Sequence, residues 1–120
     1  LVVFNAKSPI VEDLKRSPER CFRIGDHMIN MRQRWLPGGD GGTVLKHGAS
    51  VYDAAFVLAD YLNRNSISLT NQRVIELGCG PGLGAIGAAI SDPTVLEIIA
   101  TDGDKELLSL TQENIDLNIP

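Results

Sequence analysis

Five glycines lie between residues 78 and 87, within the stretch "VIELGCGPGLGAIGAA" that occupies residues 74 to 89. Each glycine loses more backbone freedom on folding than any other residue, so a cluster of this density is costly. A turn from a strand into a helix needs one glycine or two. The excess indicates that a ligand approaches the backbone closely, with a turn that binds nothing as the alternative.

Two common nucleotide-binding loops match this stretch poorly. A phosphate-binding P-loop ends in lysine followed by serine or threonine, and this loop carries no cation. The dinucleotide fingerprint G-x-G-x-x-G occurs at residues 82 to 87, but its first glycine should directly follow the strand, as Gly78 does. Counted from Gly78, the third glycine would fall on Leu83. A dinucleotide is therefore only an alternative ligand.

The spacing also fits the pattern E-x-G-x-G-x-G, whose fixed positions are Glu76, Gly78, Gly80 and Gly82. Glu76 places a carboxylate near the loop, where it can fix the loop or meet a cationic group. Bare backbone around Cys79 lets a flat ligand lie against the chain without a cradle for phosphates. Such a ligand would join a cationic amino-acid part to a nucleoside.

A second acidic residue, Asp102, lies at the end of the next predicted strand. The acidic residue at this place in nucleotide-binding βαβ units accepts hydrogen bonds from ribose hydroxyls. The alternative role for Asp102 is to cap the helix that follows, but we assign that role to Asp104. Together, Glu76, the glycine loop and Asp102 fit S-adenosylmethionine as the cofactor.

The glycine loop lies within a predicted strand–helix–strand–helix unit. This order predicts parallel strands with a right-handed crossover in an open α/β sheet. The first strand is predicted to be buried, and Gly84 and Gly87 are predicted to let the first helix pack close to the sheet. Two strands are too few for such a sheet, so we expect further strands after Pro120, with a contribution from an N-terminal hairpin as the alternative. The predicted strands are residues 73–77 and 94–102, and the predicted helices are residues 84–90 and 104–118.

Upstream of this unit, the sequence predicts an irregular arm, a β-hairpin and a loop. Residues 1–20 mix apolar with charged residues and contain two prolines, which is typical of an irregular arm. The following residues turn at Gly25-Asp26 and then alternate in polarity, which predicts a hairpin. Residues 36–42 are rich in glycine and predict a loop. The alternation places Ile29, Met31 and Gln33 on one face of the hairpin and Met28, Asn30 and Arg32 on the other.

The clearest helix signal covers residues 50–65. Ser50, with Asp53 three residues later, predicts a capping box at the start of this helix. Apolar residues recur at spacings of three and four and predict one buried stripe. The residues of this stripe are Val51, Ala54, Ala55, Leu58, Tyr61 and Leu62.

The bulk composition restricts the classes of function. The chain has 120 residues, which fits one domain, and a formal net charge of −4, which argues against a nucleic-acid partner. No apolar run approaches the roughly 20 residues that span a bilayer. Cys21 and Cys79 are predicted to be free thiols in a reducing compartment. His27 and His47 are predicted to be solvated, and no residues have metal-ligand spacing.

The predicted unit resembles motif I and the post-I motif of the seven-strand S-adenosylmethionine-dependent methyltransferases. Residues 21–120 also resemble methyltransferase family 16, the methyltransferase-like protein-lysine methyltransferases, because "NMRQRW" and "YDAAFVLADYL" are similar to its N-terminal signature. The resemblance implies an α/β, Rossmann-like seven-strand methyltransferase fold, preceded by a β-hairpin and a helix. In this chain that fold stops after the second βα unit.

The family's functional residues are carried over only where its motifs match. The resemblance places its glycine-loop contacts on Gly78, Cys79 and Gly80, and its post-I acidic residue on Asp102. An aromatic residue that helps to enclose the cofactor falls on Tyr52, where tryptophan is usual, although plain packing would also explain a tyrosine. The family's substrate-side motif follows later strands, so the catalytic residues stay unknown here.

The resemblance implies that the chain is the cofactor-binding part of a protein-lysine N-methyltransferase. Such an enzyme transfers a methyl group from S-adenosylmethionine to a lysine ε-amine and leaves S-adenosylhomocysteine. The expected partner is a protein substrate, such as a chaperone or a translation factor, rather than nucleic acid or a membrane. The expected compartment is the cytoplasm, with the nucleus as a second one. The alternatives are a small-molecule methyltransferase with the same cofactor and a non-catalytic binding module.

Overall fold

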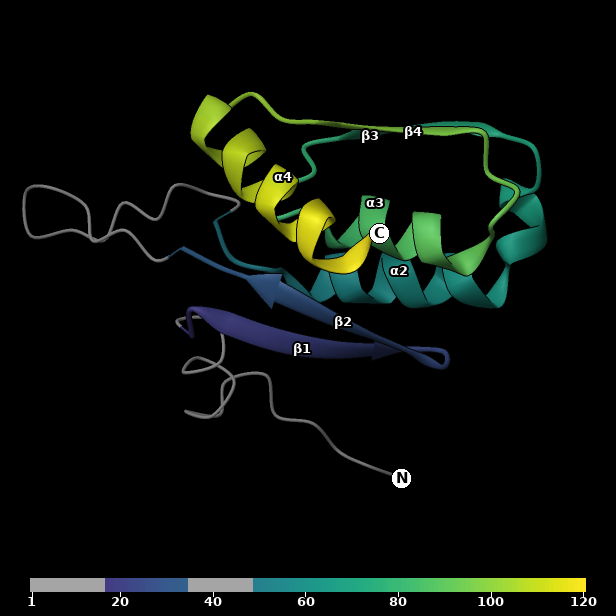
Figure 1. Ribbon diagram of the computed structural model, residues 1–120, viewed down its shortest axis with the longest axis horizontal. Coiled ribbons are helices and arrows are strands. Elements are labelled where there is room, and N and C mark those ends of the chain that lie inside the picture. The colour runs from purple at the N-terminus through teal and green to yellow at the C-terminus, as the bar shows by residue number, and fades with distance from the viewer. Residues whose placement is uncertain (1–16, 35–48) are drawn as a thin grey trace, which may run out of the picture.

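The computed structural model describes residues 17–34 and 49–120. The predicted arm over residues 1–16, the predicted loop at 36–42 and His47 lie outside the described residues. Within the described ranges, a β-hairpin and α2 precede two consecutive βα units, which is the order that the sequence predicts (Figure 1).

The N-terminal hairpin consists of β1 (Glu19–Ile24) and β2 (His27–Arg32), which pair antiparallel around the predicted two-residue turn. β1 begins inside the stretch that the sequence assigned to the arm. Gly25 has a φ of +59°, which suits glycine in a tight turn. The predicted alternation is confirmed, because Ile29, Met31 and Gln33 are buried.

Helix α2 (Asp53–Arg64) begins later than predicted. Its N-cap residue is Tyr52, and no side chain caps it, so the predicted Ser50 capping box is wrong. The residues before the helix are tied to the hairpin instead. The Val51 backbone N–H donates to Gln33 Oε1 at 2.8 Å, and this bond holds the chain extended up to the start of α2.

The buried face of α2 also differs from the predicted stripe. Leu58 and Tyr61 are 43% and 60% exposed. Ala59 is fully buried, and Ala55 and Phe56 pack against the core. The small side chain of Ala59 faces the next helix, so close helix packing rather than apolar bulk decides which face is buried. The short 3-10 helix η1 (Ser66–Leu69) follows α2.

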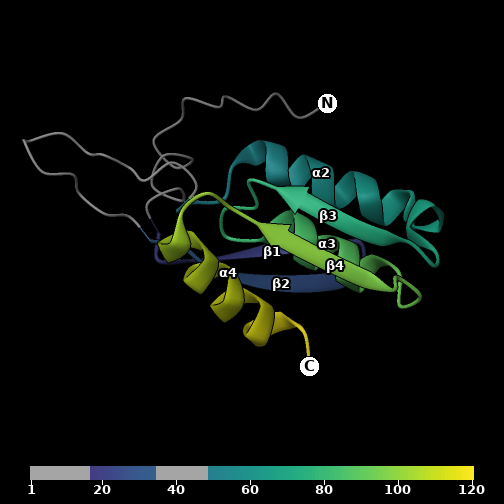
Figure 2. The same cartoon turned by 90° about the horizontal axis from the view of Figure 1, so that it is seen from above.

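The two βα units contain the predicted parallel strands. β3 (Arg73–Leu77) pairs in parallel with β4 (Glu97–Thr101), and α3 (Leu83–Ser91) connects them. α3 and α2 pack side by side between this sheet and the hairpin (Figures 1 and 2). The second helix of the unit, α4 (Lys105–Asn118), packs beside β2.

β3 is half-buried on one face and exposed on the other, which corrects the prediction of a buried strand. Ile75 and Leu77 are 60% and 79% exposed on the face that points away from α3. The main core lies on the other side, between α3, α2 and the hairpin. None of the helices in the described ranges is long and apolar enough to span a membrane. The core residues are Phe22, Ile24, Ile29, Met31, Val51, Ala59, Leu83 and Ile86.

Candidate functional site

The loop between β3 and α3 turns on three glycines with left-handed backbone. Gly78, Gly80 and Gly82 have φ angles of +67°, +53° and +97°, a region that other residues rarely adopt. A Cβ atom added at Gly78 would meet nothing within 4 Å. Gly78 is exposed, whereas Gly80 is buried. The open, bare backbone of this loop therefore lies at Gly78.

The other glycines of the cluster make room for side chains of the protein. A Cβ atom at Gly82 would lie 2.9 Å from the Thr111 methyl group, and one at Gly84 would collide with the Glu76 carboxylate. A Cβ atom at Gly87 would lie 2.7 Å from Ala59 Cβ of α2. The sequence predicted that both helix glycines face the sheet. That prediction is wrong for Gly87, which faces another helix.

Glu76 supports the loop from the strand side. Its Oε2 accepts a hydrogen bond of 2.8 Å from the Ala85 N–H, in the first turn of α3. Burial raises the pKa of Glu76, and the bond from Ala85 offsets part of that rise. Of the two roles that the sequence left open for Glu76, fixing the loop is therefore visible in the structure.

Asp102 follows β4 and reaches across to the glycine loop. Its Oδ2 accepts from the Gly80 N–H at 3.0 Å, and its Oδ1 accepts from the Asp104 N–H at 3.0 Å. Asp104 is the N-cap of α4 and accepts from the Glu106 N–H at 2.9 Å, as predicted. Asp102 is therefore free of the capping role and lies beside the loop.

The structure adds two residues that the sequence did not single out. Thr111 Oγ1 lies 2.7 Å from the Gly80 carbonyl oxygen and 2.8 Å from the Leu107 carbonyl oxygen, and these two acceptors share its single proton. Asn114 Nδ2 donates to the Pro81 carbonyl at 2.9 Å. Both residues are buried on α4. Their spacing could have identified them in the sequence. A threonine and an asparagine one turn apart face the same side as the apolar residues of that helix.

The sequence also assigned Cys79 and Tyr52 to the site. The Cys79 thiol is buried, and burial raises its pKa, so the group stays protonated at neutral pH. Its backbone N–H donates to the Thr101 carbonyl at 2.8 Å. Tyr52 is 47% exposed and precedes α2, which begins at the end of the molecule where β3 and β4 end (Figure 2).

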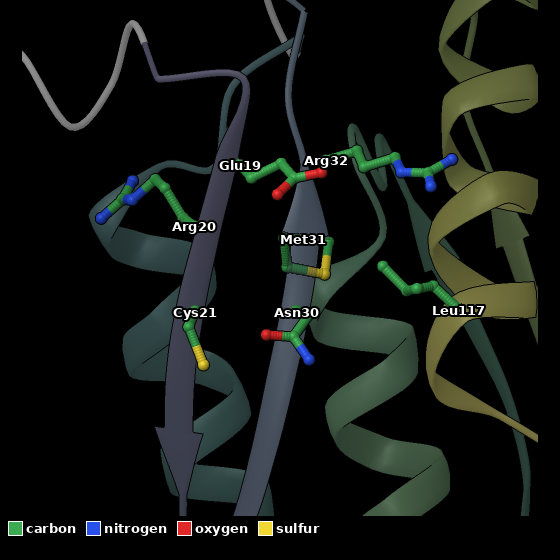
Figure 3. A pocket seen from close by; sticks show the side chains of 7 residues that line it. All are labelled: Glu19, Arg20, Cys21, Asn30, Met31, Arg32 and Leu117. Carbon is green, nitrogen blue, oxygen red and sulfur yellow. The ribbon is translucent and has the colours of Figure 1, made fainter.

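A separate pocket of about 390 Å³ lies on the hairpin and α4. Figure 3 shows Cys21 and Asn30 on the two paired strands, with Leu117 on α4 facing them. None of the predicted site residues lines this pocket, so it is distinct from the glycine loop. The described residues hold no group of three or more His, Cys, Asp or Glu that could bind a metal. The lining residues are Glu19, Arg20, Cys21, Asn30, Met31, Arg32 and Leu117.

The family model for lysine methyltransferases matches residues 40–120, which is more than half of the chain and includes the glycine loop, Asp102 and α4. The chain belongs to the lysine methyltransferase family. This confirms the resemblance that the sequence motifs indicated, and the observed βα units are those of the Rossmann-like methyltransferase fold.

Individual members of the lysine methyltransferase family align along most of the chain. Protein N-lysine methyltransferase METTL21A of Xenopus tropicalis is 37% identical over 112 residues, which are 92% of this chain and 47% of the frog protein. The METTL21A protein of Mus musculus is 31% identical over 120 residues, which are 100% of this chain and 50% of the mouse protein. EEF1A lysine methyltransferase 3 of Mus musculus is 33% identical over 81 residues, 66% of this chain and 32% of that protein. The chain thus spans about half the length of its METTL21A relatives.

Proposed function

We propose that this chain provides the S-adenosylmethionine-binding part of a protein-lysine N-methyltransferase. The observation that carries the proposal is the open space beside Gly78, next to a loop that Glu76 and Asp102 hold from two sides. An uncovered, left-handed glycine between a strand and a helix fits a ligand that lies flat against the backbone. Membership of the lysine methyltransferase family supports the same cofactor.

The donor and acceptor groups at the loop also fit this cofactor. Each carboxylate oxygen of Asp102 accepts one backbone N–H, and an oxygen with two lone pairs can still accept a ribose hydroxyl. Glu76 supplies negative charge for the cationic amino-acid part. Tyr52 offers an aromatic face at the rim, and the backbone of Cys79, Gly80 and Gly82 shapes the loop.

Bound S-adenosylmethionine supplies a methyl group on a positively charged sulfur. The chain's own residues bind and orient that cofactor and exclude water from it. Holding two reactants in line is a large part of catalysis in such transfers. A rigid loop matters for this purpose, because a displacement of about 1 Å can reduce the rate by about 100-fold.

The proposed acceptor is the ε-amine of a lysine in another protein. A relative named EEF1A lysine methyltransferase 3 supports a translation factor as the substrate class, and a chaperone is the other class that we propose. The free thiols Cys21 and Cys79 suit a reducing compartment, so we propose the cytoplasm and the nucleus. Fractionation of cells that express the tagged full-length protein tests this location.

Calorimetry on the full-length protein tests the cofactor. We expect wild type to bind S-adenosylmethionine and S-adenosylhomocysteine, and Gly78→Ala to lose most of that affinity because its methyl group fills the open space. Gly103→Ala controls for a methyl group added in open space, and thermal unfolding of both variants reports the strain that alanine adds at the left-handed Gly78. If wild type binds neither ligand, the proposal is wrong and a non-catalytic module is favoured.

Transfer of a radiolabelled methyl group to a cell lysate tests the acceptor. We expect label in protein, on lysine, after digestion and residue mapping. Label only in the small-molecule fraction would contradict a protein substrate and favour the small-molecule alternative.

A further inference from the structure

We propose that Thr111 and Asn114 are positioning residues, which clamp the glycine loop from α4 in the shape that binds the cofactor. The inference rests on the proposed function, because it names how that same site is held. The buried Asn114 side chain also joins three parts of the protein, which are the glycine loop, α4 and the N-terminal hairpin.

Thr111 fixes the loop at Gly80 and Gly82. Its hydroxyl lies 2.7 Å from the Gly80 carbonyl oxygen and 2.8 Å from the Leu107 carbonyl oxygen. Its methyl group occupies the space that a Cβ atom at Gly82 would need. The Gly80 peptide is thus held on both sides, because Asp102 accepts from its N–H. Thr111 is 3% exposed, so water does not replace these bonds readily.

Asn114 adds a second bond to the next carbonyl of the loop. Its side chain is fully buried, and Nδ2 donates to the Pro81 carbonyl at 2.9 Å. The same amide also pairs with the edge of β2. Nδ2 donates to the Arg32 carbonyl at 3.0 Å, and Oδ1 accepts from the Arg32 N–H at 2.7 Å. The side-chain amide therefore makes the two hydrogen bonds to Arg32 that the backbone of a neighbouring strand would make, and both its oxygen and its nitrogen have partners.

Asn118 provides an internal control one turn further along α4. It pairs with the Asn30 backbone in the same way, accepting from the N–H at 3.0 Å and donating to the carbonyl at 2.8 Å. Its remaining bond of 2.8 Å goes to the Asn114 carbonyl within α4, not to the loop. α4 lies beside β2 (Figure 1), and both asparagine side chains join these two elements. Asn118 therefore shares the structural role of Asn114 and lacks the loop contact.

The geometry explains why the clamp acts on the binding side of the loop. Two consecutive carbonyl groups, at Gly80 and Pro81, accept from α4. Because these carbonyl groups are fixed, the peptide planes of the loop have little freedom to rotate. The bare backbone at Gly78 therefore stays exposed to the cofactor. Loss of the Thr111 hydroxyl leaves the Gly80 carbonyl only the weak contact of 3.7 Å from the Cys79 thiol, and loss of the Asn114 amide removes the bond to the Pro81 carbonyl. In either case the loop would shift to recover a stronger partner.

The test uses the full-length protein and five proteins: wild type, Thr111→Val, Thr111→Ser, Asn114→Ala and Asn118→Ala. Calorimetry gives the affinity for S-adenosylmethionine, thermal unfolding gives stability, and hydrogen exchange reports the loop amides in the ligand-free protein. We expect Thr111→Val and Asn114→Ala to bind about three- to tenfold more weakly, the loss of about one buried hydrogen bond. Thr111→Ser keeps the hydroxyl and should retain most of the affinity. Asn118→Ala should lower the melting temperature without weakening binding.

The outcomes separate this inference from the proposed function. If Asn118→Ala weakens binding as much as Asn114→Ala does, or Thr111→Val binds like wild type, the clamp is overturned. If Asn114→Ala does not fold, the comparison of Thr111→Val with Thr111→Ser decides. If wild type binds no S-adenosylmethionine, the proposed function fails. The role of Thr111 and Asn114 in holding the loop is then tested by hydrogen exchange alone. Faster exchange at residues 78–82 in Thr111→Val but not in Asn118→Ala supports it, and unchanged exchange in both overturns it.

Discussion

Glu76 is the residue at which stability and the proposed function oppose each other. Burial next to α3 disfavours its charged form and raises its pKa in the folded state, despite the bond from the Ala85 N–H. A carboxyl group with a raised folded-state pKa contributes its stability fully below the unfolded pKa. That contribution is lost as the pH rises through the folded pKa. The charged form of Glu76 is therefore one that folding does not favour, which is common at binding sites.

Replacement of this carboxylate by its neutral isostere should stabilise the protein at neutral pH. Glu76→Gln keeps an oxygen for the Ala85 N–H and removes the charge. We expect a higher free energy of unfolding than wild type at pH 7, and a difference that vanishes as the pH falls below the ordinary glutamate pKa of 4.5. Urea denaturation across this pH range measures it. A variant that is less stable than wild type at pH 7 would contradict this account.

Asp102 and Asp104 form a matched pair of acidic residues with separate tasks. Asp102→Ala should weaken binding of S-adenosylmethionine by roughly 1.5–3 kcal/mol, the range for a hydrogen bond to a charged group. Asp104→Ala should instead cost about 1 kcal/mol of stability through the lost cap and leave affinity near wild type. Calorimetry and thermal unfolding on both variants separate the two effects. Equal affinities in the two variants would show that Asp102 neither contacts the cofactor nor shapes the loop for binding.

At the scale of elements, the sequence predicts the type of each helix or strand more accurately than it predicts which face of that element is buried. Alternation in the hairpin and β-branched runs in the strands are local signals, and the elements they predict are present. The buried face of α2 is not a local property. Ala59 is buried because α3 approaches it at Gly87, and that approach leaves the larger Leu58 exposed. Likewise, the extended start of α2 depends on a bond to the distant Gln33.

The contact between α2 and α3 gives a prediction whose sign is unusual. Replacing a glycine inside a helix by alanine ordinarily stabilises by about 0.5–1 kcal/mol. Gly87→Ala should instead destabilise by about 1–3 kcal/mol, because its Cβ would lie 2.7 Å from Ala59 Cβ and 3.3 Å from Ala59 Cα. Thermal unfolding measures this. Adding Ala59→Gly should recover part of the loss in a double-mutant cycle, whereas additive losses would rule out this contact as the cause.

At the scale of the whole molecule, the sequence predicts part of the candidate site's geometry, because the positions of two acidic residues follow from their spacing. Glu76 and Asp102 stand at the carboxyl ends of adjacent parallel strands, which follows from the order of the elements. Thr111 and Asn114 could not be found in this way. A polar residue on a helix gains its role only when the helix is docked, and α4 is docked through contacts with β2 and the loop.

The same scale explains the misjudged burial of β3. An apolar run is equally compatible with a strand covered on both faces and with one covered on a single face. In the structure Ile75 lies directly beside Ile99 of β4, and both are exposed together with Leu77. These three residues are here called the outer sheet face. Neither α3 nor the hairpin covers it, because both lie on the opposite side of the sheet (Figures 1 and 2).

The outer sheet face should make the polypeptide of residues 1–120 prone to self-association when it is prepared alone, since contiguous exposed apolar patches drive association. Ile75→Thr combined with Leu77→Thr keeps β-branched or strand-compatible side chains and removes apolar surface. We expect this double variant to stay monomeric at concentrations where the unaltered polypeptide associates, as measured by sedimentation velocity. Met28→Thr, an exposed apolar residue on the hairpin, is the control and should not reduce association. If all three associate alike, the patch that drives association lies elsewhere, because only the double variant changes the outer sheet face.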